Sequence, residues 1–110
     1  MAKVHQFQLV YQLPANCPLE SLDFEDDIAE ALGNARDEKA TLHVVDGNSY
    51  GAGTIEFFVD TNDPQAALAL TKPLLESAGL LDMVVVGFRR FSEDAFTVIW
   101  PVGYSGIFKP

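Results

Sequence analysis

The stretch from Asp46 to Asp60, DGNSYGAGTIEFFVD, constrains the fold more than any other, because it joins a strong turn signal to a clear strand. An Asp-Gly pair followed by further glycines favours a hairpin. From residue 54 onward polar and apolar side chains alternate, which is typical of a strand with one buried face. We therefore expect one strand to enter the hairpin at Asp46-Gly47 and a second to leave it over residues 54–60, burying Ile55, Phe57 and Val59.

Two segments have the apolar spacing of amphipathic helices. The first is expected to begin near Asp23, which can cap it, and to end within residues 33–34. The second is expected to begin at the Asp-Pro pair 63–64, because aspartate caps a helix and proline fits its first position, and to end at Gly79. Pro73 lies inside this second helix without a backbone N–H to donate, so we expect a kink there.

Further strands are expected over four segments, residues 5–13, 40–46, 82–91 and 96–100. If each strand-helix-strand unit makes a right-handed crossover, the first strand lies beside the third and the fourth. We therefore predict an α+β fold: a ferredoxin-like βαββαβ sandwich with an additional C-terminal strand and with two helices on one face of an antiparallel sheet. The 110 residues are expected to form a single domain, 1–110.

The sheet face turned away from the helices is expected to carry mainly polar side chains. However, Phe58 would lie on this face, and residues 83–88 are apolar on both sides of their strand. The last residues, from Val102 to Phe108, are also rich in apolar side chains. These features indicate a partly covered face. Either the C-terminal tail folds over it, or a second copy packs there to make a homodimer.

The chain carries 16 acidic and 7 basic side chains, which gives a formal net charge of −9. Such a protein repels both a phosphate backbone and anionic lipid, so neither nucleic acid nor a membrane is an expected partner. Six of the acids fall between Glu20 and Glu30, where there is no Lys or Arg. This stretch is either the solvated face of the first helix or a docking surface for a basic protein.

Cys17 is the only cysteine, so no intramolecular disulfide can form, and a lone thiol is typical of a reducing compartment. The first residues pass directly into an alternating pattern, with no apolar signal core. No apolar run approaches the roughly 18 residues of a membrane span. We therefore expect a soluble, cytoplasmic protein.

The passage from Tyr50 to Asp60, followed by a helix, resembles the central strand and second helix of the RNA-recognition motif. Four positions fit the signature of that family: Gly51, Gly53, Ile55 and Phe57. Tyr50 stands where the family has Lys or Arg, and Ala52 and Thr54 stand where it has aromatic side chains that stack on bases. The resemblance therefore implies a similar layout and no RNA site.

Metal and phosphate sites are poorly supported by the sequence. The glycines between residues 47 and 53 could cradle a phosphate, but such loops normally lead into a helix, and this one leads into a strand. A hairpin loop with a bulge explains them better. His5 and His43 have no cysteine or carboxylate at ligand spacing, so each is expected to be structural or solvent-facing. No metal and no other cofactor is expected.

A polar row across the open sheet face is the sharpest candidate for a site. Four side chains form it if strand alternation places them on that face: Gln8, His43, Glu56 and Arg89. Phe58 is a further candidate binding residue on the same face. Such a row could bind a small molecule or act in catalysis. The simpler interpretation is that Arg89 or Arg90 pairs with a nearby carboxylate such as Glu93 or Asp94.

The sequence is acidic but contains no recognisable set of catalytic residues, so no catalytic residue is assigned. The sequence favours a non-enzymatic protein-binding or regulatory module. It could be an inhibitor or immunity-type protein for a basic partner, engaged through the acidic first helix, or a homodimer formed through the open sheet face. The alternative is a small cytoplasmic enzyme or small-molecule sensor that uses the polar row. Fold class does not decide between them, because one architecture serves many functions.

Overall fold

The computed structural model describes residues 5–16, 24–33, 43–51, 53–104, 106 and 108. Within these residues the elements follow in the order β1 (Phe7–Pro14), α1 (Phe24–Ala31), β2 (His43–Gly51), β3 (Thr54–Thr61), α2 (Pro64–Ser77), β4 (Val85–Arg90) and β5 (Thr97–Trp100). The predicted order of helices and strands is therefore confirmed. Cys17, Glu20, the expected cap Asp23 and the expected start of the second strand before residue 43 lie outside the described residues.

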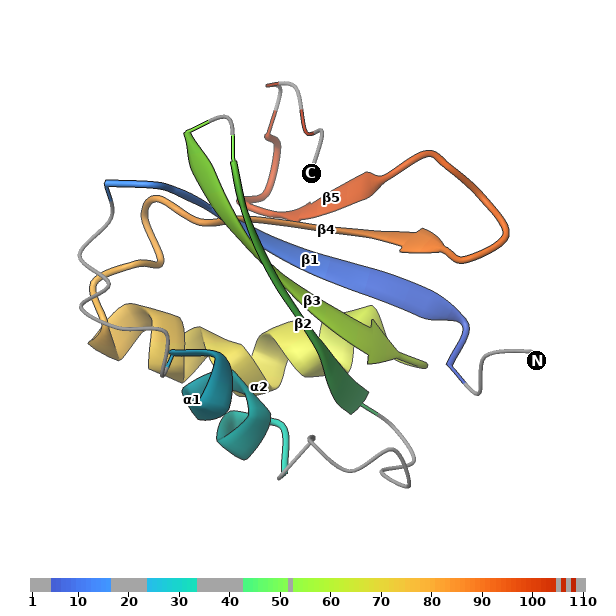
Figure 1. The fold of residues 1–110 in the computed structure, drawn as a ribbon, viewed down its shortest axis with the longest axis horizontal. Coiled ribbons are helices and arrows are strands. Elements are labelled where there is room, and N and C mark those ends of the chain that lie inside the picture. Colours follow the sequence, from blue (N-terminus) through green and yellow to red (C-terminus); the bar gives the residue numbers. More distant parts are fainter. Residues whose placement is uncertain are drawn as a thin grey trace.

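The strands form one open antiparallel sheet in the order β2-β3-β1-β4-β5. The first strand thus lies between the third and the fourth, and β5 lies outside β4. Figure 1 shows both helices on the same side of this sheet. The molecule is therefore an α+β protein. Neither described helix is long and apolar enough to cross a membrane.

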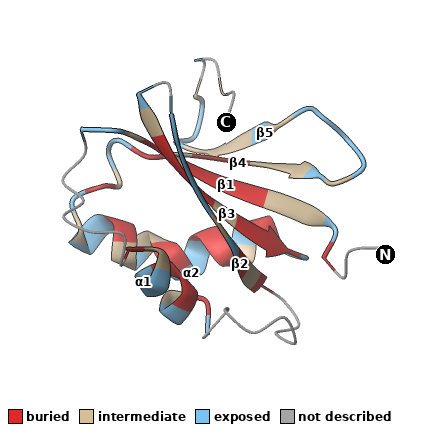
Figure 2. Ribbon diagram, in the orientation of Figure 1, coloured by how far each residue is buried: buried red, intermediate tan, exposed pale blue. Residues whose placement is uncertain are grey.

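The core lies between the helices and the sheet, and Figure 2 shows buried residues along β1, β3 and the helices. Tyr11 of β1 lies opposite Phe57 of β3, and the Phe57 ring meets Phe24 of α1 with centroids 5.5 Å apart. The Tyr11 hydroxyl lies 2.8 Å from Thr71 Oγ1 of α2. Because the Thr71 hydroxyl donates to the Ala67 carbonyl, Tyr11 is the donor to Thr71. Burial raises the pKa of Tyr11 well above its ordinary value.

The hairpin between β2 and β3 is present, but its turn does not lie at Asp46-Gly47 as predicted. β2 continues to Gly51, and its register with β3 shifts between Val45 and Gly47. Gly47 has a φ of 144°, which other residues rarely adopt, so the extra residue is absorbed as a bulge inside the strand. The chain reverses instead next to Gly53, whose φ is 79°.

The C-terminal tail contacts the sheet face opposite the helices. A Cβ atom at Gly87 of β4 would lie 2.6 Å from the Phe108 ring, so this ring rests directly on the strand. Phe108 also meets Phe96 edge to face, with ring centroids 5.5 Å apart. Gly87 lies opposite Val10 of β1, which is fully buried. The tail therefore covers this part of the face.

Asp63 caps α2 as predicted. Its carboxylate accepts a hydrogen bond of 3.1 Å from the Ala66 N–H, and Pro64 occupies the start of the helix. The helix then continues through Pro73 to Ser77. A proline at this interior position leaves one helical carbonyl without its usual N–H partner.

Replacing Pro73 with alanine is expected to raise the free energy of unfolding by about 1–3 kcal/mol, because alanine is favoured over proline inside a helix. Pro73 is exposed, so little packing is lost. Urea unfolding measures the gain. Pro64→Ala is the comparison at the start of the helix: proline suits the first helical position and Pro64 is buried, so no gain is expected there. Equal gains in the two variants would contradict this account of Pro73.

Candidate functional site

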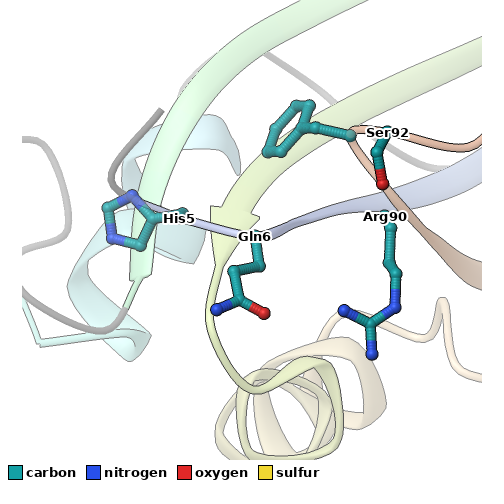
Figure 3. Close-up of a pocket in the computed structure, with 5 residues that line it drawn as sticks. His5, Gln6, Arg90 and Ser92 are labelled. Carbon is teal, nitrogen blue, oxygen red and sulfur yellow. The ribbon is translucent and has the colours of Figure 1, made fainter. Parts of the chain in front are cut away.

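A cavity of about 330 Å³ lies at the end of the sheet where β1 begins and β4 ends. Its walls are His5, Gln6, Arg90, Phe91 and Ser92. Figure 3 shows the Gln6 amide and the Arg90 guanidinium extending in the same direction from neighbouring segments. The cavity thus combines donor groups from two parts of the chain that are distant in sequence.

Hydrogen bonds fix the backbone on both sides of this cavity. The Phe91 N–H donates to the Gln6 carbonyl at 3.0 Å, which extends the pairing of β1 with β4 by one step. The Gln6 N–H donates to Asn62 Oδ1 at 3.0 Å. The walls are therefore set by the fold itself.

Arg89 stabilises the turn that follows β4. Its Nε donates to Gln8 Oε1 at 3.0 Å, and its Nη1 donates to the Glu93 carbonyl at 2.9 Å. Nη1 also makes longer contacts of 3.4 Å to the carbonyls of Arg90 and Phe91. A guanidinium that bridges several carbonyls holds a turn in one conformation. Arg89 thus has a structural role beside the cavity.

Arg90 is engaged much more weakly. Its Nε lies 3.5 Å from Glu93 Oε1, so the predicted pairing with a local carboxylate is confirmed for Arg90. The two side chains are 55% and 59% exposed, and an ion pair of this kind contributes little. The guanidinium also lies 5.0 Å from the centre of the Phe7 ring. Its charge is therefore held at the cavity and only weakly neutralised.

Two buried histidines lie at the same end of the sheet. His43 Nδ1 lies 2.7 Å from Thr61 Oγ1, which also accepts a hydrogen bond of 2.9 Å from the Asp63 N–H. The Nε2 atoms of His5 and His43 are buried and make no hydrogen bond to any described residue. Burial lowers the pKa of His43; the Asp63 carboxylate opposes this effect, and His5 adds to it. The buried environment therefore favours a neutral His43 ring.

Protonation of His43 is expected to make stability fall as the pH falls. Its pKa is lower in the folded state, so below about pH 6.5 the unfolded state binds more protons and gains population. The free energy of unfolding should therefore decrease between about pH 7.5 and about pH 5.5. Urea unfolding at the two pH values checks this. His43→Gln is expected to show a smaller decrease, and an equal decrease in both proteins would rule out His43 as its source.

Three of the four side chains predicted for the polar row lie on the sheet face opposite the helices: Gln8, Glu56 and Arg89. The further candidate Phe58 lies on the same face. The three polar side chains do not form one row. Gln8 lies opposite Arg89 and accepts its hydrogen bond. Glu56 lies further along β3, where its Oε2 accepts hydrogen bonds from Gln12 Nε2 at 3.1 Å and from Thr54 Oγ1 at 2.8 Å. Phe58 lies opposite Val10, between these two groups.

The prediction that His43 lines the open face is wrong. His43 pairs with Thr61, and it shares its face of β2 with Val45, which belongs to the core beneath the helices. The bulge between Val45 and Gly47 reverses the alternation of side chains between the two faces of β2. The face of His43 therefore cannot be extrapolated from the residues that follow the bulge.

A second hollow, of about 290 Å³, lies between the two helices. It is lined by Asp27, Glu30 and Ala31 of α1 and by Leu74 of α2. Leu70, one helical turn before Leu74, is 49% exposed. The eight residues of α1 include four acids and no Lys or Arg. We call this hollow the acidic groove; it combines carboxylates with apolar side chains.

Sequence reasoning singled out the Arg89-Arg90 pair but missed the cavity beside it. Gln6 and Ser92 carry no signal of their own, and only the register of β1 with β4 brings them together. The only sequence signal that could have indicated this cavity was the pair of basic residues just before a turn in an acidic chain.

No family model matches the chain, and neither a curated protein nor a solved structure matches it. Among the residues that the structure describes, no group of three or more His, Cys, Asp or Glu side chains is placed to hold a metal ion.

Proposed function

We propose that this protein is a non-enzymatic binding module that recognises a basic protein partner through the acidic groove. One observation carries the proposal: the groove between α1 and α2 has Asp27 and Glu30 beside the apolar side chains of Ala31 and Leu74. The formal net charge of −9 over the whole chain also favours a basic partner. A regulatory protein, such as an inhibitor or immunity-type protein for a cationic target, is the role that fits this surface.

The chemistry of the groove specifies the kind of segment that it would bind. An amphipathic helix can place aliphatic side chains against Leu70 and Leu74 and hold Lys or Arg beside Asp27 and Glu30. Apolar contact then supplies affinity, and the opposite charges speed the encounter and select the partner. The α2 lysine does not compete for the carboxylates, because Lys72 Nζ lies 4.2 Å from the centre of the Trp100 ring.

We also propose a ferredoxin-like topology and a cytoplasmic location for this protein. A ferredoxin-like sandwich with an additional strand is supported by the placement of β1 between β3 and β4 and by β5 outside them. A cytoplasmic location fits the lone Cys17, and the net charge argues against nucleic acid and membranes as partners.

The open sheet face gives less support to the other functions considered. A homodimer through this face would have to accommodate the Phe108 ring, which rests on Gly87. An enzyme or sensor that uses the polar row would need Gln8, Glu56 and Arg89 to act together. Gln8 instead accepts a hydrogen bond from Arg89, while Glu56 accepts hydrogen bonds from Gln12 and Thr54.

The test uses a synthetic Lys/Leu peptide that forms an amphipathic helix, labelled for fluorescence anisotropy. A scrambled peptide of equal charge, without an apolar face, is the reference. The amphipathic peptide is expected to bind more tightly, and Asp27→Asn combined with Glu30→Gln is expected to weaken it by about tenfold, since two exposed charge pairs are lost.

Asp82→Asn combined with Asp94→Asn is the matched control, because it removes two exposed acids outside the groove. This control is expected to change the affinity by less than about twofold. Equal binding of the two peptides, or equal losses in the two double variants, would show that net charge rather than the groove attracts the peptide.

A further inference from the structure

The cavity at the end of β1 and β4 has the chemistry of an anion site in an otherwise acidic protein. Arg90 supplies a permanent positive charge, and Gln6 and Ser92 supply an amide and a hydroxyl that can donate hydrogen bonds. Phe91 adds an aromatic wall. We propose that this cavity binds a small organic anion, a carboxylate or a phosphate ester with an apolar part, through Arg90.

Arg90 is available for such a ligand. Its contact with Glu93 is 3.5 Å long and lies at the surface, where an ion pair is weak. A carboxylate or phosphate can take two parallel hydrogen bonds from a guanidinium, which is a stronger arrangement than this contact. The ligand therefore displaces Glu93 at small cost, and Phe7 remains beneath the guanidinium to orient it.

The site is organised before a ligand arrives. The hydrogen bond from the Phe91 N–H to the Gln6 carbonyl joins the two walls, and Arg89 holds the turn that carries Ser92. A preformed site avoids part of the entropy cost of ordering its groups on binding. The volume of about 330 Å³ falls at the lower end of the range for small-molecule sites.

The net charge of −9 does not prevent anion binding at this place. Charges more than about 8 Å apart are largely screened at physiological ionic strength, so the local guanidinium dominates inside the cavity. The acidic groove and this cavity share no residue, so the two proposals stand independently.

The experiment follows amide NMR signals while phenyl phosphate, benzoate or inorganic phosphate is added, with benzyl alcohol as the neutral probe. Phenyl phosphate or benzoate is expected to shift the signals of Gln6 and residues 90–92 saturably, and the tighter of the two assigns the anionic group. Inorganic phosphate should bind more weakly, because it lacks an apolar part. Absence of saturation with both aromatic anions, or equal shifts with benzyl alcohol, would overturn the proposal.

Two exposed substitutions with opposite expected effects make the test specific. Arg90→Gln is expected to weaken binding by about tenfold or more, because the charged donor is lost. Glu93→Gln is expected to tighten binding by about twofold to fivefold, because the competing carboxylate is removed. Signals far from the cavity report whether each variant is folded. An unchanged affinity in both variants would show that Arg90 is not the anion contact.

Discussion

Replacing Phe57 with alanine is expected to lower the free energy of unfolding by about 3–5 kcal/mol. Phe57 is 1% exposed, lies opposite Tyr11 on the central pair of strands, and meets the Phe24 ring of α1. Truncation leaves a cavity between sheet and helix that neither can fill. Such a loss is a large share of the roughly 5–15 kcal/mol that holds a typical domain folded. The midpoint of urea unfolding measures it.

Phe58→Ala is the matched control, since it makes the same change one residue further along β3. Phe58 lies on the opposite face and is only partly buried, so about 1–2 kcal/mol is expected to be lost. Comparable losses in the two variants would contradict the assignment of Phe57 to the face that packs on the helices.

Local sequence patterns predicted the structure correctly within regular strands and at the start of the second helix. The alternation over residues 54–60 placed Ile55, Phe57 and Val59 in the core, because one face of that strand packs on the helices. The Asp63 cap was equally clear, since its carboxylate bonds to the third residue that follows. In each case neighbouring residues determine the outcome.

The remaining features depend on contacts between segments that are distant in the chain. The bulge after Val45 reversed the alternation of β2, so His43 lies beneath the helices rather than on the open face. The cavity joins Gln6 to Ser92 through the register of β1 with β4. The acidic groove requires the packing of α1 on α2. None of these contacts leaves a periodic signal in the sequence.

Arg89→Lys is expected to cost about 1.5–3 kcal/mol of the free energy of unfolding, even though the charge is kept. Arg89 uses two separate nitrogens to reach Gln8 and the Glu93 carbonyl, and a single ammonium cannot reproduce that geometry. Urea unfolding gives the loss. The amide signals of residues 91–93 are expected to shift, because the turn loses the donor that holds it.

Arg90→Lys is the matched control on the adjacent residue. Arg90 makes an exposed ion pair of 3.5 Å, so its replacement is expected to change stability by less than about 0.5 kcal/mol. A similar loss in both variants would mean that the turn responds to positive charge alone. A loss confined to Arg89 would separate the two residues by role: Arg89 stabilises the turn beside the cavity, and Arg90 carries a charge on which stability hardly depends.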